Sequence, residues 1–134
     1  MERITRKDIS EQKEFTKYGD TFTQIKNNPE TGWWLYKRVS NEAFNGEHIE
    51  SYEVVRGKPY KNPNGEKVLV YPSESDWGVY GYTIPKCWWA KPTIDFIMER
   101  DTISAQEMYE FKKTLKDHPD NPYKTPNKSE IREF

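Results

Sequence analysis

Few side chains in this sequence have the types and spacing that catalysis or metal binding needs. The chain has two histidines, His48 and His118, and a single cysteine, Cys87. A metal site needs several histidine, cysteine or carboxylate ligands at defined spacing, and the segment His118-Pro119-Asp120 offers one pair of ligands. Cys87 would be a nucleophile only beside an activating base, and its sequence neighbours provide none. We therefore expect no catalytic residue, no metal site and no cofactor, and we predict that the protein is not an enzyme.

Aromatic residues are the other group with chemical meaning. They make up 15% of the residues in a chain whose mean hydropathy is -1.09, and they include the doublets Trp33-Trp34 and Trp88-Trp89. Large rings fill hydrophobic cores and also form recognition surfaces. Because aliphatic residues are scarce here, we expect most of the rings to form the core and the remainder to bind a partner.

Side-chain alternation predicts which rings share a face of a sheet. In a strand over residues 33–39, Trp34 and Tyr36 point to one side while Trp33 and Leu35 point to the other. In a strand over residues 77–84, the rings of Tyr80 and Tyr82 share a face. If both pairs lie on a face that the helices leave open, they form an exposed aromatic patch flanked by arginines, which marks an interaction site. The predicted partner-binding residues are Trp34, Tyr36, Arg38, Arg56, Tyr80 and Tyr82.

Strand-forming segments separated by turn signals occupy the middle of the chain. The dipeptide Asn64-Gly65 predicts a hairpin turn, and residues 27–32 predict another turn. Alternation of Ile94, Phe96 and Met98 predicts a further strand after them. The predicted strands cover residues 33–39, 50–56, 67–71, 77–84 and 94–98.

Helical patterns flank these strands. Asp8, with Glu11 three residues on, and rings at spacings of three and four predict a helix over residues 8–18, and residues 21–25 fit either the same stripe or a short strand. A capping box from Ser104 to Glu107 predicts a C-terminal helix that ends near residue 116. This order predicts an α+β fold, in which an antiparallel sheet of four to five strands is packed by the C-terminal helix and a shorter N-terminal helix.

Length and composition predict one domain followed by a tail. A chain of 134 residues is long enough for one domain with its own core. We assign residues 1–116 to a single α+β domain. Residues 117–134 contain Pro119, Pro122 and Pro126 among polar residues, so we expect an extended or flexible tail that adds little to the stability of the domain.

The charge of the chain is balanced. Its 21 basic and 22 acidic residues give a net charge of -1, which argues against a general nucleic-acid binder but leaves a local basic patch possible. A single cysteine fits a reducing compartment, and the sequence shows no signal peptide and no segment of membrane length. We therefore expect a cytoplasmic protein without membrane association.

A central segment resembles a known group of proteins. The run Tyr71-Pro72-Ser73 followed by Trp77-Gly78 and Gly81-Tyr82, together with the upstream Tyr52-Glu53-Val54-Val55, resembles a small hypothetical family encoded by bacteriophages and mobile elements of gut bacteria. The family has no assigned activity. The resemblance implies a phage or mobile-element setting, in which small proteins without enzyme motifs are often inhibitors of host defence enzymes.

Two functions follow from these observations. The first is a non-enzymatic inhibitor or adaptor that binds a host protein, such as a defence nuclease, in the host cytoplasm; an anti-CRISPR protein is one such anti-defence protein. The second is a single-stranded nucleic-acid-binding module that uses an aromatic sheet face. The two differ in a measurable property, because affinity for an oligonucleotide falls with salt. The partner, the stoichiometry and the oligomeric state do not follow from the sequence.

Overall fold

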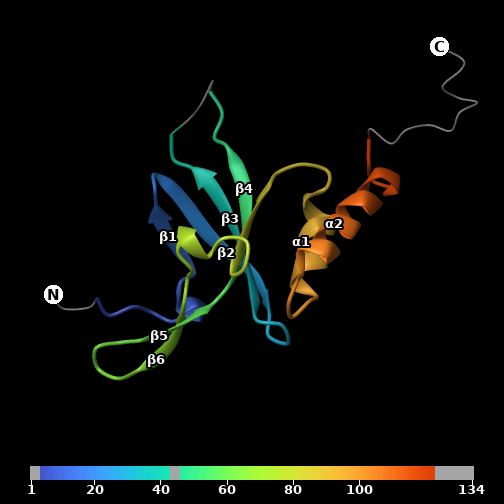
Figure 1. Ribbon diagram of the computed structural model, residues 1–134. Helices are drawn as coiled ribbons and strands as arrows, with labels where there is room; N and C mark the ends of the chain where they lie inside the picture. Colours follow the sequence, from blue (N-terminus) through green and yellow to red (C-terminus); the bar gives the residue numbers. More distant parts are fainter. Residues whose placement is uncertain (1–3, 43–45, 123–134) are drawn as a thin grey trace, which may run out of the picture.

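The computed structural model describes residues 4–42 and 46–122, which form an α+β fold as predicted (Figure 1). Within this part of the chain, an antiparallel five-stranded sheet has the order β1-β2-β3-β4-β7. The helices lie together on one side of this sheet, and none of the described helices is long and apolar enough to cross a membrane. The sheet contains β1 (Glu14–Lys17), β2 (Asp20–Asn28), β3 (Trp33–Ser40), β4 (Glu50–Arg56) and β7 (Gly81–Pro85), and the helices are α1 (Ala90–Met98) and α2 (Ala105–Thr114).

Short elements surround the sheet. A separate hairpin of β5 (Lys58–Lys61) and β6 (Lys67–Val70) connects β4 to the segment before β7 and projects away from the sheet (Figure 1). Its turn contains Asn64-Gly65, as predicted, and Gly65 takes the positive φ of 90° that such a turn requires. Three 3₁₀ turns complete the described chain: η1 (Ile9–Glu11), η2 (Glu74–Asp76) and η3 (Leu115–Asp117).

The central strand β3 buries rings on both faces of the sheet. Trp33 and Leu35 pack with α1 in one cluster, whereas Tyr36 belongs to a second cluster on the opposite face, against which Trp34 packs. The side chains of β3 alternate between the two faces as predicted, but this alternation does not produce an exposed aromatic patch. Because η1 and the segment around Tyr71 cover the second face, neither face of β3 is an open aromatic surface.

The N-terminal helix predicted over residues 8–18 is wrong. Asp8 does act as an N-cap, but only for the single turn η1, and a β-hairpin of β1 and β2 follows. The ring spacing that suggested a helical stripe arises from the hairpin register, which places Phe15 opposite Phe22 with stacked rings 4.8 Å apart. The tight turn at Tyr18-Gly19, where both φ angles are positive, sets this register.

The structure confirms three of the predicted strands, shortens one and replaces one by a helix. Those at 33–39, 50–56 and 67–71 are confirmed as β3, β4 and β6, and the strand predicted over 77–84 begins only at Gly81, after a turn in which Gly78 has a φ of 94°. The strand predicted over 94–98 is wrong, because this segment is the end of α1. Ile94, Ile97 and Met98 are buried at helical spacing, and this stripe faces the sheet.

The C-terminal helix is confirmed. It begins at the predicted capping box, in which the Ser104 hydroxyl accepts a hydrogen bond from the Glu107 amide. After α2, the described chain continues through η3, and the Asn121 side chain donates to the carbonyls of Leu115 and Lys116. Residues 123–134 of the predicted tail lie outside the described residues, so the division of the chain at residue 117 stays a prediction.

Trp33 is the residue whose truncation should cost the most stability on the helix-covered face. It is 1% exposed, its indole donates to the Arg100 carbonyl at 2.6 Å, and the Arg56 guanidinium lies 4.4 Å from its ring centre. We expect Trp33→Ala to lower the free energy of unfolding by about 3–5 kcal/mol in urea denaturation. The control Val79→Ala, at a position 69% exposed, should change it by less than about 0.5 kcal/mol. Equal effects would show that Trp33 is not a core residue.

Candidate functional site

Two hollows flank the β7 edge of the sheet, and they share the walls formed by Trp77 and Thr83. We call the hollow between β7 and the helices the groove; its volume is about 640 Å³. We call the hollow on the opposite face the cleft; its volume is about 290 Å³. Trp77 is held at this junction because its indole N–H donates to the Thr83 hydroxyl at 2.9 Å and its ring packs on Gly81, where a Cβ would lie 2.9 Å from the ring.

The groove runs along the free edge of β7. Four consecutive residues from Gly81 to Ile84 line it, although neighbouring strand residues point to opposite faces. A hollow that touches all four must therefore follow the edge of the strand. β7 pairs with β4 on one side, and on the other side an isolated bridge from Trp77 occupies Gly81. On that outer side, no described strand pairs with residues 82–85.

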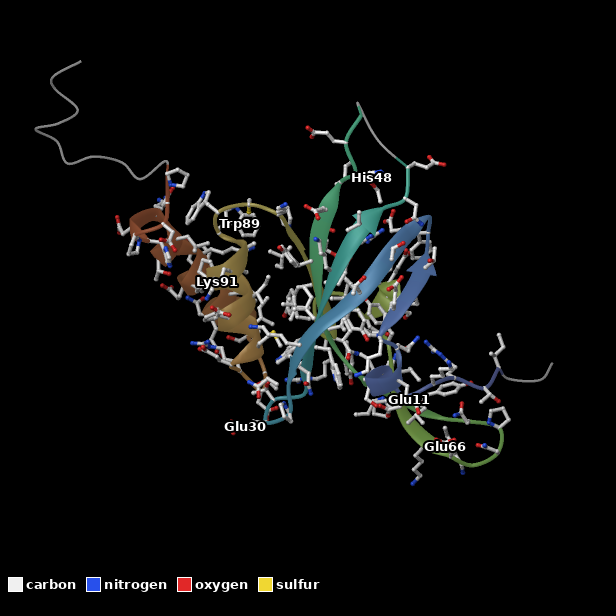
Figure 2. The ribbon with its side chains drawn as sticks, turned by 180° about the vertical axis from the view of Figure 1, so that it is seen from behind. Glu11, Glu30, His48, Glu66, Trp89 and Lys91 are labelled. Carbon is white, nitrogen blue, oxygen red and sulfur yellow. The ribbon has the colours of Figure 1, made fainter. Side chains whose placement is uncertain are left out.

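The helices supply the opposite wall of the groove, which is mainly apolar. Ile97 and Thr93 come from α1, Met108 comes from α2, and Leu115 follows α2. Figure 2 shows Trp89, another lining residue, at the start of α1 where the connection from β7 enters the helix. The Thr93 hydroxyl is buried and has no hydrogen-bond partner among the described residues. A buried hydroxyl without a hydrogen-bond partner lowers the stability of the folded state.

The floor of the cleft is a charged network. The Arg38 Nε atom lies 2.6 Å from an Asp20 oxygen, and its Nη1 atom lies 2.8 Å from Glu53 Oε1. The Thr83 hydroxyl donates to the other Glu53 oxygen at 2.7 Å. Glu53 is 1% exposed. Burial raises the pKa of Glu53 above its ordinary value, and this effect outweighs the lowering by Arg38 and Thr83.

A second unpartnered hydroxyl lies in the cleft. The Tyr71 ring is 6% exposed and packs edge-on against Tyr36 at 5.3 Å, but its hydroxyl has no hydrogen-bond partner among the described residues. The neighbouring Tyr36 differs, because its hydroxyl donates to the Gln12 carbonyl at 2.9 Å and accepts from Gln24 at 3.0 Å. Burial raises the pKa of Tyr36 to about 12, and it raises that of Tyr71 further. Both phenols therefore stay neutral at physiological pH.

The outer rim of the cleft contains a strained residue. Tyr18 has a φ of 58° and is the one non-glycine residue with positive φ in the described chain. Its hydroxyl hydrogen-bonds Glu74, which raises the pKa of Tyr18, and the Lys17 ammonium lies 5.0 Å from its ring centre. All three residues line the cleft. Residues with strained backbone dihedral angles are often found at binding sites, where the surrounding structure stabilises them.

Two of the six predicted partner-binding residues reach these hollows. Arg38 lies on the floor of the cleft, and Tyr82 lies in the groove, where its ring packs 6.0 Å from Trp33 and its hydroxyl donates to the Gly78 carbonyl. The condition for an aromatic patch on one face is not met, because Tyr82 shares the helix-covered face with Trp33 while Arg38 lies on the opposite face.

The other four predicted residues serve the fold or lie elsewhere. Tyr36 is fully buried, which corrects its assignment to an exposed patch, and Trp34 is half-buried against the same cluster. Arg56 is used internally, because its guanidinium donates to the carbonyls of Thr31 and Asp101. Tyr80 lies in the turn before β7, where the Lys58 ammonium is 6.0 Å from its ring centre.

Sequence reasoning missed Trp77, Thr83 and Glu53 as site residues. Glu53 had a usable signal, since a carboxylate between Tyr52 and Val54 in a central strand must be paired if it is buried. Trp77 and Thr83 had none, because their importance comes from the position of β7 at the edge of the sheet. Within the described residues, no group of three or more histidine, cysteine or acidic side chains is placed to hold a metal ion.

Replacing Tyr36 or Tyr71 by phenylalanine should show that their two hydroxyls contribute differently to stability. Tyr36→Phe removes the hydrogen bonds of the hydroxyl to the Gln12 carbonyl and from the Gln24 side chain and should lower the free energy of unfolding by about 1–2 kcal/mol. Tyr71→Phe removes a hydroxyl that has no partner within residues 4–42 and 46–122 and should be neutral or stabilising. Urea denaturation of both variants tests this. A loss in Tyr71→Phe as large as in Tyr36→Phe would show that the Tyr71 hydroxyl is paired.

The pH dependence of stability should carry opposite contributions from two glutamates. The folded-state pKa of Glu53 lies above its ordinary value of 4.5, so its contribution falls as pH rises from about 4.5 through the folded-state pKa. Lys37 and Lys86 lower the pKa of Glu50 to about 2, so its contribution is present above pH 4.5 and is lost as pH falls toward 2.

Urea denaturation across pH, comparing wild type with Glu53→Gln and with Glu50→Gln, checks both signs. The stability difference between wild type and Glu53→Gln should decrease above pH 4.5, where the wild-type carboxyl ionises. The difference for Glu50→Gln should increase between pH 2 and 4.5 and should shrink in high salt. The same sign for both glutamates would contradict the buried position of Glu53.

Comparison of this chain with protein-family models, with curated proteins and with solved structures finds no match.

Proposed function

We propose that this protein is a non-catalytic binding protein that receives an extended segment of a partner protein along the β7 edge. The observation that supports this most directly is the groove that follows residues 81–84 beside an unpaired strand edge. Strand addition to a free edge is a recurring mode of peptide recognition, in which backbone hydrogen bonds give affinity and side-chain pockets give specificity.

The chemistry of the groove suits a partner with apolar side chains. Its walls include Trp77, Tyr82, Trp89 and Met108, and tryptophan, tyrosine and methionine are enriched in protein interfaces. An incoming strand would direct every second side chain toward the helices, where Ile97 and Met108 line the wall. The segment 82–85 is short, which fits the capture of one defined segment and limits open-ended sheet growth.

The setting of this function is part of the same proposal. The segment from Tyr71 to Tyr82 that resembles phage and mobile-element proteins contributes Tyr71 and Trp77 to the cleft and Gly78 and Tyr82 to the groove. We propose that the partner is a host protein, such as a defence nuclease, and that the protein acts as an inhibitor or adaptor in the host cytoplasm. Binding of a substrate-recognition strand or a regulatory strand of such an enzyme would block it without any catalysis.

The second function considered, binding of single-stranded nucleic acid, would need rings exposed on one face of the sheet. Tyr36 is buried, and Trp34 packs against the buried cluster on that face. These rings are therefore not free to stack on bases, and we propose a protein partner alone.

Selection from a library of random linear peptides tests strand addition at β7. We expect the selected peptides to carry apolar residues at alternating positions and to bind in competition with one another. Met108→Glu places a charge on the groove wall formed by α2 and should weaken these peptides by about tenfold or more, which corresponds to about 1.4 kcal/mol. Fluorescence titration measures the affinities, and hydrogen exchange should show new protection in β7 when a peptide is bound.

The matched control is Tyr109→Glu, the same new charge on the next residue of α2. Tyr109 is 57% exposed and does not line the groove, so peptide affinity should be unchanged. Equal weakening by both variants, or protection confined to other strands, would contradict binding along β7. Captured host proteins should lose binding to Met108→Glu and keep binding to Tyr109→Glu.

A further inference from the structure

We propose that the cleft binds the cationic side chain, lysine or arginine, of the partner segment that pairs with β7. The inference rests on the proposed function in one respect, namely that the cation belongs to the segment in the groove. It adds a specificity: the partner segment alternates apolar and basic residues, with the apolar ones toward the helices and the basic one toward the cleft.

The charges of the cleft favour a cation. Glu53 and Arg38 line it, and the Arg38 guanidinium is shared between Glu53 and Asp20, a carboxylate that lies outside the lining. Two carboxylates therefore share one guanidinium, which leaves one negative charge in excess beside the cleft. On the rim, Lys17 and Glu74 carry opposite charges and cancel. A partly buried excess charge is costly unless a counter-charge approaches it, and an incoming ammonium or guanidinium supplies that charge.

The walls of the cleft suit the same ligand. Phe22, Tyr71 and Trp77 line it, and aromatic rings attract cations through their faces. Arg38 already uses one such contact, because its guanidinium carbon lies 5.1 Å from the Phe22 ring centre. The Tyr71 hydroxyl is buried and has no hydrogen-bond partner among the described residues, so it would accept an N–H of the ligand once the Tyr71 ring turns toward the cleft. An anion would meet the same hydroxyl, but it would also meet Glu53 and a guanidinium that is already shared between two carboxylates.

Strand geometry connects the cleft to the groove. Residues directly opposite each other on neighbouring strands project to the same face of a sheet. Thr83 projects toward the cleft, where its hydroxyl donates to Glu53, so the partner residue opposite Thr83 projects there too. Partner residues opposite Tyr82 and Ile84 project toward the helices, because these two side chains pack with the helix-side cluster.

Titration with N-acetyl-arginine amide tests the cleft without requiring strand pairing. The readout is the NMR signal of the Trp77 indole N–H, assigned by its loss in Trp77→Phe. We expect a saturable shift for the arginine compound and about fivefold weaker binding for N-acetyl-citrulline amide, its neutral isostere. Equal binding of the two, no shift of the Trp77 signal, or tighter binding of N-acetyl-glutamate amide would overturn the proposal.

Two variants distinguish a loss of binding caused by the missing charge from a loss caused by unfolding. Glu53→Gln should weaken the arginine compound by about fivefold or more, in line with a partly desolvated charge pair. Because this change also touches Arg38, Tyr71→Phe serves as a second variant that removes only the free hydroxyl; it should weaken binding while leaving urea stability unchanged or higher. Unaltered binding in both variants would overturn the assignment of the cleft.

Selected peptides distinguish this inference from the proposed function. Peptides that bind along β7 should lose about fivefold in affinity when their basic residue is replaced by norleucine, and Glu53→Gln should abolish that difference. Peptides that pair with β7 but show no preference for a basic residue would refute the cleft inference and leave strand addition intact. Arginine binding in the cleft with no peptide binding along β7 would refute strand addition alone and retain the cation site.

Discussion

The fold depends on covering both faces of a sheet in a chain with few aliphatic residues. Trp33 and Tyr36 occupy opposite faces of β3 with exposures of 1% and 0%, and each also binds the layer that covers its face. Trp33 donates to the Arg100 carbonyl after α1, and Tyr36 donates to the Gln12 carbonyl after η1. Leucine could fill part of this volume but could not make these bonds. The aromatic composition therefore follows from a sheet held between short, polar segments.

The alternation along β3 was predictable from sequence, but the covering of its faces was not. Burial of the second face depends on Ile9 and Tyr71, which lie far from β3 in the chain and carry no local sign of where they pack. The hairpin of β1 and β2 was misread for a related reason, because the spacing of Phe15 and Phe22 also fits a helix. The tight turn at Tyr18 decides between them, and tyrosine is not a residue from which such a turn is expected.

Because local sequence does not reveal how distant segments pack, only some of the site residues could be predicted. Arg38 and Tyr82 are predicted as members of an exposed patch, yet they reach the hollows in different ways. Arg38 extends from the central strand β3 to Glu53 on β4, and Tyr82 lies in the groove because β7 is the edge strand. Edge position is a property of the whole topology: β7 follows β4 in the sheet only because β5 and β6 form a separate hairpin. Local patterns can indicate a strand and its two faces, but they cannot indicate which strand lacks a neighbour.

The distribution of unpaired polar groups argues for function at this edge. Three buried side-chain polar atoms lack a hydrogen-bond partner among the described residues. Two of them are the hydroxyls of Tyr71 and Thr93, residues that line the cleft and the groove respectively. Each costs about 1–3 kcal/mol if it stays unpaired, and phenylalanine or valine would avoid that cost with little change in shape. Stability alone does not account for two such groups beside β7. In the proposed complex, a segment bound along β7 would supply a donor on one side of the strand and an acceptor on the other.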